Sequence, residues 1–165
     1  MNEPTAGEIW QLREQLERDA ASLLGGALFA FSRLDAHVGL VVAAIMRVTG
    51  KEDQVPKVDA LSFHKRLAFV ERFIAESTEV ETSGRAAMTS WLADAHSIRT
   101  QRNQLIHGRW DVDPYKRKIL NLVGQHDSTA QQTIEYTLED LQAFIEGARA
   151  LQSKLANARR RWGLP

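Results

Sequence analysis

The sequence predicts a mainly α-helical protein, an up-and-down bundle of four to five helices with a small β-hairpin-like excursion after the fourth helix. Apolar residues return every three to four positions over most of the chain, which is the period of a helix buried on one face. Polar segments that contain glycine or proline separate the apolar ones. The length of 165 residues suits one globular domain, so we expect a single helical domain over residues 1–165.

The first half of the chain predicts two helices. The first covers roughly residues 7–24 and the second about 27–49, and Gly25 with Gly26 marks a break or kink between them. The second helix is apolar on nearly all sides and is therefore expected in the middle of the bundle. Its longest apolar run, residues 38–46, is shorter than the roughly 20 residues that cross a bilayer. We therefore expect a buried core helix and no membrane association.

Two further helices are expected, each after a polar link. The third runs from about residue 59 to 77, with Asp59 or Ser62 as its capping residue. The fourth runs from about 85 to 107 and ends at Gly108, in a position where a left-handed backbone is usual.

The pattern changes after the fourth helix. Alternating or β-branched stretches within residues 109–137 predict a short two- or three-stranded or irregular excursion. Thr137, followed by Asp140 three residues later, resembles a capping box and begins the last helix, which continues to about Arg161. The basic cluster 159–161 has two interpretations. In one interpretation its side chains contact phosphate. In the other they lie in solvent at the C-terminal end of a helix, where the helix dipole favours cations.

Composition excludes several classes of function. Lys and Arg total 21, as do Asp and Glu, so the whole molecule has no field that attracts nucleic acid or an anionic membrane, and such binding has to be local. Because the chain lacks cysteine, it has no disulfide, thiolate nucleophile or thiolate zinc site. The polar start lacks the basic and apolar parts of a secretion signal, and a cytoplasmic location is expected.

Common catalytic motifs are absent from the sequence. It contains no P-loop, no GxGxxG after a strand, no GxSxG elbow and no HExxH pair. The histidines form no close pair at metal-ligand spacing, so we expect neither a metal nor a cofactor. These histidines are His37, His64, His96, His107 and His126.

The predicted fourth helix carries an arginine in its apolar sector. At about 100° per residue, Arg102 falls near the middle of that sector, where a leucine would be expected. A buried guanidinium is costly unless it is paired and hydrogen-bonded. Asp35 interrupts the apolar second helix and needs a partner as well. We therefore predict a buried or half-buried ion pair between Asp35 and Arg102.

A line of polar residues lies on the adjoining face of the same helix. His96, Arg99, Asn103 and His107 follow one another at helical spacing. An exposed polar face opposite a core is the alternative interpretation, above all for His96. His107 occupies the last turn, where the dipole favours the imidazolium, little more than one turn after Arg102. A cation that holds a phosphate and an imidazole that moves a proton are the minimum for metal-free cleavage of RNA.

The segment Arg102 to Gly108 reads Arg-Asn-Gln-Leu-Ile-His-Gly and resembles the motif of HEPN domains. In that motif a histidine follows an arginine after four to six residues, and a polar residue such as Asn directly follows the arginine. The match covers seven of 165 residues, and the predicted order of elements is compatible with the family's layout. The resemblance implies a HEPN-like helical domain and a metal-independent endoribonuclease whose two protomers bring Arg and His together across a dimer cleft.

The resemblance also implies roles for individual residues. Arg102 would bind the scissile phosphate and stabilise the charge of the transition state, His107 would act as general acid or base, and Asn103 would orient the phosphate or the imidazole. The RNA's own 2′-hydroxyl would attack, leaving a 2′,3′-cyclic phosphate and a 5′-hydroxyl, without a cofactor. The candidate substrate-binding residues are His96, Arg99 and Arg109.

The family also contains members that have lost cleavage and serve as dimerisation, nucleotide-binding or toxin-partner modules. The alternative function is therefore a non-catalytic HEPN-like module of a toxin–antitoxin or defence system, in which Arg102 is a structural residue paired with a buried acid. The expected partners are a second copy of the chain, RNA as substrate, and an antitoxin or nucleotidyltransferase.

Overall fold

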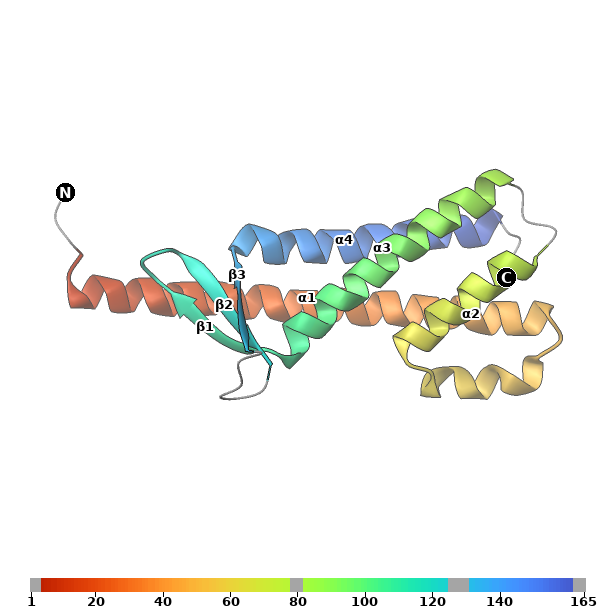
Figure 1. Cartoon of the computed structure of the whole chain (residues 1–165), viewed down its shortest axis with the longest axis horizontal. Helices are drawn as coiled ribbons and strands as arrows, with labels where there is room; N and C mark the ends of the chain where they lie inside the picture. Colours follow the sequence, from red (N-terminus) through yellow and green to blue (C-terminus); the bar gives the residue numbers. More distant parts are fainter. Residues whose placement is uncertain (1–3, 78–81, 125–130, 162–165) are drawn as a thin grey trace. The chain divides into compact units, whose positions relative to one another are not determined.

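The computed structural model describes residues 4–77, 82–124 and 131–161 (Figure 1). Its helices are α1 (Ala6–Val48), the 3-10 helix η1 (Glu52–Ala60), α2 (Phe63–Glu76), α3 (Thr82–His107) and α4 (Leu138–Arg161). Its strands are β1 (Arg109–Asp113), β2 (Lys118–Val123) and β3 (Gln132–Tyr136). The predicted mainly helical class is confirmed, and the predicted β excursion is a three-stranded antiparallel sheet between α3 and α4.

The chain divides into two units. Unit 1 consists of residues 1–29 and 101–146, and unit 2 of residues 30–100 and 147–165. The helices α1, α3 and α4 each contribute one segment to each unit.

Helix α1 is continuous over 43 residues, so the predicted break at Gly25 and Gly26 is wrong. A glycine costs a helix interior only about 1 kcal/mol, which tertiary packing readily offsets. Gly26 also has a packing role, since a Cβ there would lie 3.1 Å from Cδ1 of Ile145 on α4. Thr5 and Glu8 form a capping box at the start of α1, where the Thr5 N–H donates to Glu8 Oε2 at 2.7 Å.

Unit 1 contains the sheet, whose strand order is β1-β2-β3. Asp111 of β1 lies opposite Leu120 of β2, which in turn lies opposite Glu135 of β3. Arg13 of α1 forms an ion pair with Asp111 at 2.8 Å and so connects this helix to the sheet. The buried apolar residues of the unit are Leu16, Ala20, Ala27, Leu105, Val112, Ile119, Leu141, Phe144 and Ile145.

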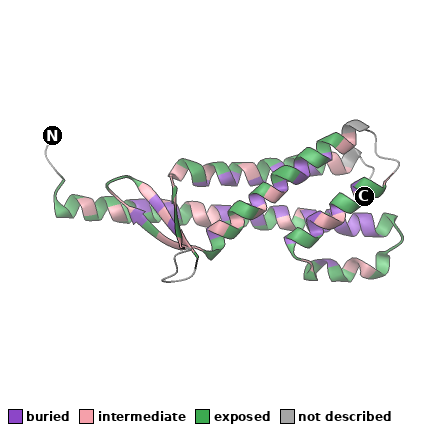
Figure 2. Ribbon diagram, viewed as in Figure 1, coloured by how far each residue is buried: buried purple, intermediate pink, exposed green. Residues whose placement is uncertain are grey.

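Unit 2 contains the predicted core helix. Residues 38–46 are buried with the exception of Leu40, which confirms the expectation for this segment (Figure 2). By length and composition α1 is apolar enough to cross a membrane, and 56% of its most apolar stretch is buried, as in a core helix. Phe31 and Phe63 pack edge to face at 4.9 Å, and the indole N–H of Trp91 donates to the carbonyl of Leu151 at 2.9 Å. These contacts join α1 to α2 and α3 to α4.

A buried guanidinium connects α2 to α1 within unit 2. Arg66 of α2 is 7% exposed, and its Nη1 donates to Oδ1 of Asp35 at 2.8 Å and to the carbonyl of the same residue at 3.1 Å. The sequence predicts Arg102 as the partner of Asp35, whereas the structure gives Arg66. Gly39 makes room for the pair, since a Cβ there would lie 3.2 Å from Arg66 Nη1. Helical period shows which face a residue occupies, but it does not show which helix that face meets.

Helix α2 begins later than the sequence predicts. Residues 52–60, which include Pro56, form η1, so α2 starts at Phe63 and Ser62 is its cap, accepting the N–H of Lys65 at 3.4 Å. The capping box at the start of α4 is confirmed. The N–H of Thr137 donates to Asp140 Oδ2 at 2.7 Å, and the N–H of Asp140 donates to Thr137 Oγ1 at 3.1 Å.

Candidate functional site

The HEPN-like motif occupies the C-terminal end of α3 and belongs to unit 1. Arg102 is half-buried, and its Nη1 donates to Oδ1 of Asn103 at 3.1 Å. Asn103 and His107 are exposed, and His107 is the last residue of the helix. The guanidinium and the amide are therefore hydrogen-bonded to each other, and the imidazole lies at the helix end.

Two side chains of the sheet hold this helix end. The last carbonyl groups of a helix have no partner within it. Asn121 of β2 donates its Nδ2–H to the carbonyl of Gln104 at 2.9 Å, and Trp110 of β1 donates its indole N–H to the carbonyl of Leu105 at 3.1 Å. Asn121 is fully buried, which fixes its position. The sheet thus fixes the turn of α3 on which the motif lies.

Gly108 is the last residue of the motif and has a different role from the predicted one. Within the described residues the glycines with positive φ are Gly50 and Gly124, so the expectation of a left-handed backbone at Gly108 is wrong. Instead, a Cβ at Gly108 would overlap Oδ1 and Cγ of Asn121 and lie 2.7 Å from its Nδ2. A glycine is needed here because the buried Asn121 amide occupies the space that a side chain would fill.

The nearby carboxylates of β1 already have cationic partners. Asp111 pairs with Arg13 at 2.8 Å, and Oδ2 of Asp113 lies 3.9 Å from Nζ of Lys116. Arg109 is half-buried, and its Nη2 has no hydrogen-bond partner among the residues that the structure describes. The predicted substrate-binding residue Arg109 therefore follows the motif directly and keeps donor capacity for a ligand.

A largely apolar hollow of about 400 Å³ adjoins Arg102 within unit 1. Leu28 and Ile106, which line it, are 55% and 39% exposed. The placement of Arg102 among apolar residues agrees with the predicted sector. The other residues that line the hollow are Leu24, Gly25, Ala27, Leu105, Trp110 and Phe144.

Burial also affects a tyrosine beside this helix end. Tyr136 of β3 packs against Trp110 with ring centroids 5.7 Å apart and the ring planes tilted by 45°. Burial raises the pKa of Tyr136, and a hydrogen bond from the Asn121 side chain opposes the rise. The phenol therefore stays neutral and belongs to the packed support of the site.

The two other candidate residues on α3 belong to unit 2. His96 and Arg99 are half-buried, and the ring of His96 lies 6.0 Å from the ring of His64 on α2. No local sequence pattern connects these two histidines, because they are 32 positions apart in the chain. His126 lies outside the described residues.

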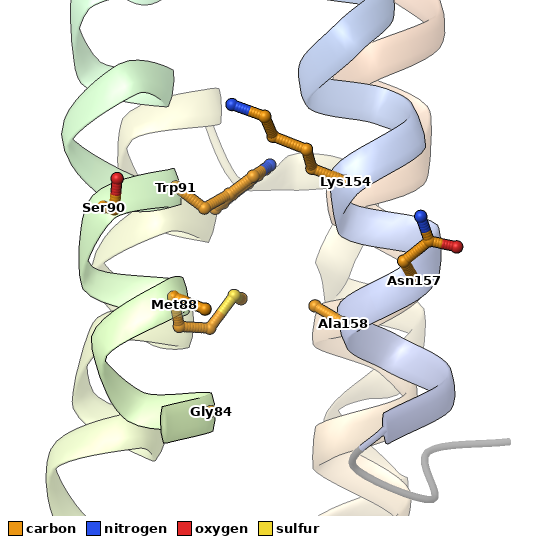
Figure 3. A pocket seen from close by; sticks show the side chains of 8 residues that line it. Gly84, Met88, Ser90, Trp91, Lys154, Asn157 and Ala158 are labelled. Atoms are coloured by element: carbon orange, nitrogen blue, oxygen red, sulfur yellow. The ribbon is translucent and has the colours of Figure 1, made fainter. Parts of the chain in front are cut away.

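A second hollow, of about 350 Å³, lies in unit 2 between α3 and α4 (Figure 3). Met88 and Trp91 of α3 face Lys154 and Ala158 of α4 across it. None of the predicted site residues lines it, so it offers no support for the motif's chemistry.

Neither the search for a metal site nor the comparisons with known proteins assign a function to these residues. In the described ranges no group of three His, Asp or Glu side chains is placed to hold a metal ion. Comparisons with protein-family models, curated proteins and solved structures give no match. The resemblance to HEPN domains therefore rests on the seven-residue motif and the order of the elements.

Proposed function

We propose that this protein is a metal-independent endoribonuclease of HEPN type that cleaves single-stranded RNA as a homodimer. One observation carries the proposal. Arg102, Asn103 and His107 occupy one helix end, with the arginine hydrogen-bonded to the amide and the imidazole exposed. The side chains of Asn121 and Trp110 hold that end in place.

These residue types suit cleavage by transesterification. A guanidinium donates two parallel hydrogen bonds to phosphate and stabilises the charge that develops on its oxygens. A base removes the proton of the 2′-hydroxyl, the 2′-oxygen bonds to phosphorus, and an acid protonates the departing 5′-oxygen. The products are a 2′,3′-cyclic phosphate and a 5′-hydroxyl. His107 supplies the proton transfer, and Asn103 orients Arg102.

The spacing of the motif favours a site shared by two chains. Arg102 and His107 are five positions apart on the helix, which corresponds to about 140° around the axis and roughly 7.5 Å along it. A second copy brings another His107 to the same phosphate, so that one imidazole acts as base and the other as acid. Leu28 and Ile106 expose apolar surface beside Arg102, as interface residues do.

The decisive experiment is the His107→Ala variant with labelled single-stranded RNA in a buffer that contains a chelator. We expect the cleavage rate to fall about 10²–10⁴-fold, the contribution of one acid–base group. His37→Ala is the matched control, because His37 belongs to unit 2 and contacts the Arg33 carbonyl and Gln152. Mass spectrometry of the products should find cyclic phosphate ends.

Two results would overturn the proposal. The first is a monomer in light scattering, where the proposal expects twice the chain mass of 18.6 kDa, because a monomer has no site shared by two chains. If the wild-type protein leaves a broad RNA panel uncut at near-stoichiometric amounts, with and without divalent metal, the enzyme assignment fails.

A second candidate function is a non-catalytic HEPN-like dimerisation or nucleotide-binding module in a toxin–antitoxin or defence system. The balance of 21 basic and 21 acidic residues favours it, since a neutral chain has no long-range attraction for RNA. A stable dimer that leaves the same RNA panel uncut supports this function.

A further inference from the structure

Unit 2 contains a cluster of nitrogen-bearing side chains on α2 and α3 that the proposed nuclease chemistry does not use. His64 lies in the first turn of α2, and His96 lies in α3. Their ring centroids are 6.0 Å apart, with the planes inclined at 63°. Arg99 follows His96 by one helical turn. His64 is exposed, and His96 and Arg99 are half-buried, so the cluster is open to solvent on one side.

Among the residues that the structure describes, the guanidinium of Arg99 has no carboxylate partner. In the described part of the chain, Arg99 forms no ion pair within 4.0 Å and no hydrogen bond, and its Nε is buried. A buried donor without an acceptor is costly. Arg66 of α2 and Arg85 of α3, which lie in the same unit, have carboxylate or carbonyl acceptors. Arg99 therefore has unused donor capacity in a half-buried place.

Burial and the charges around His96 oppose its protonation. Burial, the charge of Arg99 and the neighbouring His64 lower the pKa of His96, and Glu71 of α2 partly opposes them by raising it. A pair of imidazoles is also typical of metal sites, but the charge of Arg99 beside this pair repels a divalent cation. An anion has the opposite effect, because it attracts Arg99 and favours the protonated imidazoles.

We propose that His64, His96 and Arg99 form a phosphate-binding site in unit 2. A phosphate group has several acceptor oxygens, so it receives donors from the guanidinium and from both imidazoles at once. The short distance between the rings lets one group reach both. Its residues belong to a different unit from Arg102 and His107, and the test of phosphate binding does not require cleavage of RNA.

The test is a phosphate titration followed by NMR of the histidine side chains in the full chain, with chloride at matched ionic strength as the blank. We expect the ring signals of His64 and His96 to move on addition of inorganic phosphate, and the signals of His37 to stay. The pKa of His96 should rise on binding, so phosphate should bind more tightly as the pH falls towards 6. Absence of a shift at phosphate concentrations on the order of ten millimolar would overturn the proposal.

Two substitutions with opposite expected effects separate binding from folding. Arg99→Ala should weaken phosphate binding about 10- to 100-fold, as for the loss of one hydrogen bond to a charged group. Glu71→Gln should tighten binding, because it removes the carboxylate that competes with phosphate, and Glu71 is exposed so that the fold is retained. If both substitutions leave the affinity unchanged, or if Zn²⁺ but not phosphate moves the two ring signals, the assignment is wrong.

A further comparison identifies the source of the phosphate. Adenosine 5′-monophosphate and a short RNA with hydroxyl ends are added separately to the His107→Ala variant, which does not cleave RNA under the proposed function. Shifts with the nucleotide alone assign a phosphomonoester ligand, and shifts with the RNA as well assign the nucleic-acid backbone. Both outcomes support the site, and neither depends on catalysis.

Discussion

Replacing Gly108 with alanine tests the way in which the sheet holds the motif helix. The new Cβ would overlap the carboxamide of Asn121, which is 0% exposed and cannot turn towards solvent. Forcing a methyl group into a packed site costs about 1–3 kcal/mol. Displacing Asn121 also breaks its 2.9 Å hydrogen bond to the Gln104 carbonyl, a further ~0.5–1.5 kcal/mol. We expect a loss of roughly 2–4 kcal/mol in the free energy of unfolding.

The assay is urea denaturation followed by circular dichroism and by the fluorescence of tryptophan. A loss of this size lowers the melting temperature of a chain of this length by roughly 5–15 °C. Gly108→Asn separates two explanations of the glycine. If a left-handed backbone were the reason, asparagine would be tolerated, whereas a steric reason makes it at least as harmful as alanine.

The double variant Gly108→Ala/Asn121→Ala supplies the control. Because Asn121→Ala removes the atoms that collide, the double variant should be more stable than the sum of the single effects predicts, by about 1 kcal/mol or more. A steric role of Gly108 is refuted if the free energy of unfolding of Gly108→Ala lies within about 0.5 kcal/mol of the wild type, or if the effects of the two substitutions are additive.

Further predictions concern an ion pair, a helix cap and a buried phenol. Arg66→Met should lower the free energy of unfolding by about 2–4 kcal/mol. This is less than the loss of a fully buried ion pair, because the side chain of Asp35 is 35% exposed. A melting temperature equal to that of the wild type would contradict this prediction. Thr137→Ala should cost about 1 kcal/mol through the lost helix cap. Hydrogen bonds from the Thr137 N–H and hydroxyl lower the pKa of Asp140. The stability from this cap is therefore complete above the pKa of an unfolded aspartate, near 3.9, and is lost as the pH falls through the lower pKa of the folded protein. If Asp140→Asn has the same pH dependence of unfolding as the wild type at acid pH, this prediction is wrong. Burial raises the pKa of Tyr136, so its phenolate absorbance should appear only above about pH 10. The stability of the fold should decrease as the pH rises past about 10, because the phenol ionises first in the unfolded chain. Spectrophotometric titration of the wild type and of Tyr136→Phe measures this, and an ordinary titration midpoint for Tyr136 would refute it.

Local signals in the sequence predicted most of the secondary structure. The three- to four-residue apolar period predicted α3 up to its last residue, and the pairing of Thr137 with Asp140 predicted the start of α4. The change to alternating residues predicted the strands within 109–137. These features depend on neighbours one or two turns away, so the sequence contains the information directly. The break at Gly25 was predicted wrongly, because tertiary packing outweighs a small glycine penalty.

Only the tertiary structure decided which distant side chains meet. Asp35 meets Arg66, Gly108 meets the amide of Asn121, and His64 meets His96. Each contact joins segments whose separation along the chain says nothing about their distance in space. The sequence by itself placed Arg102, Asn103 and His107 on one helix, because their spacing is local. It did not show what holds that helix end in place, because Trp110 and Asn121 reach the helix from the folded sheet.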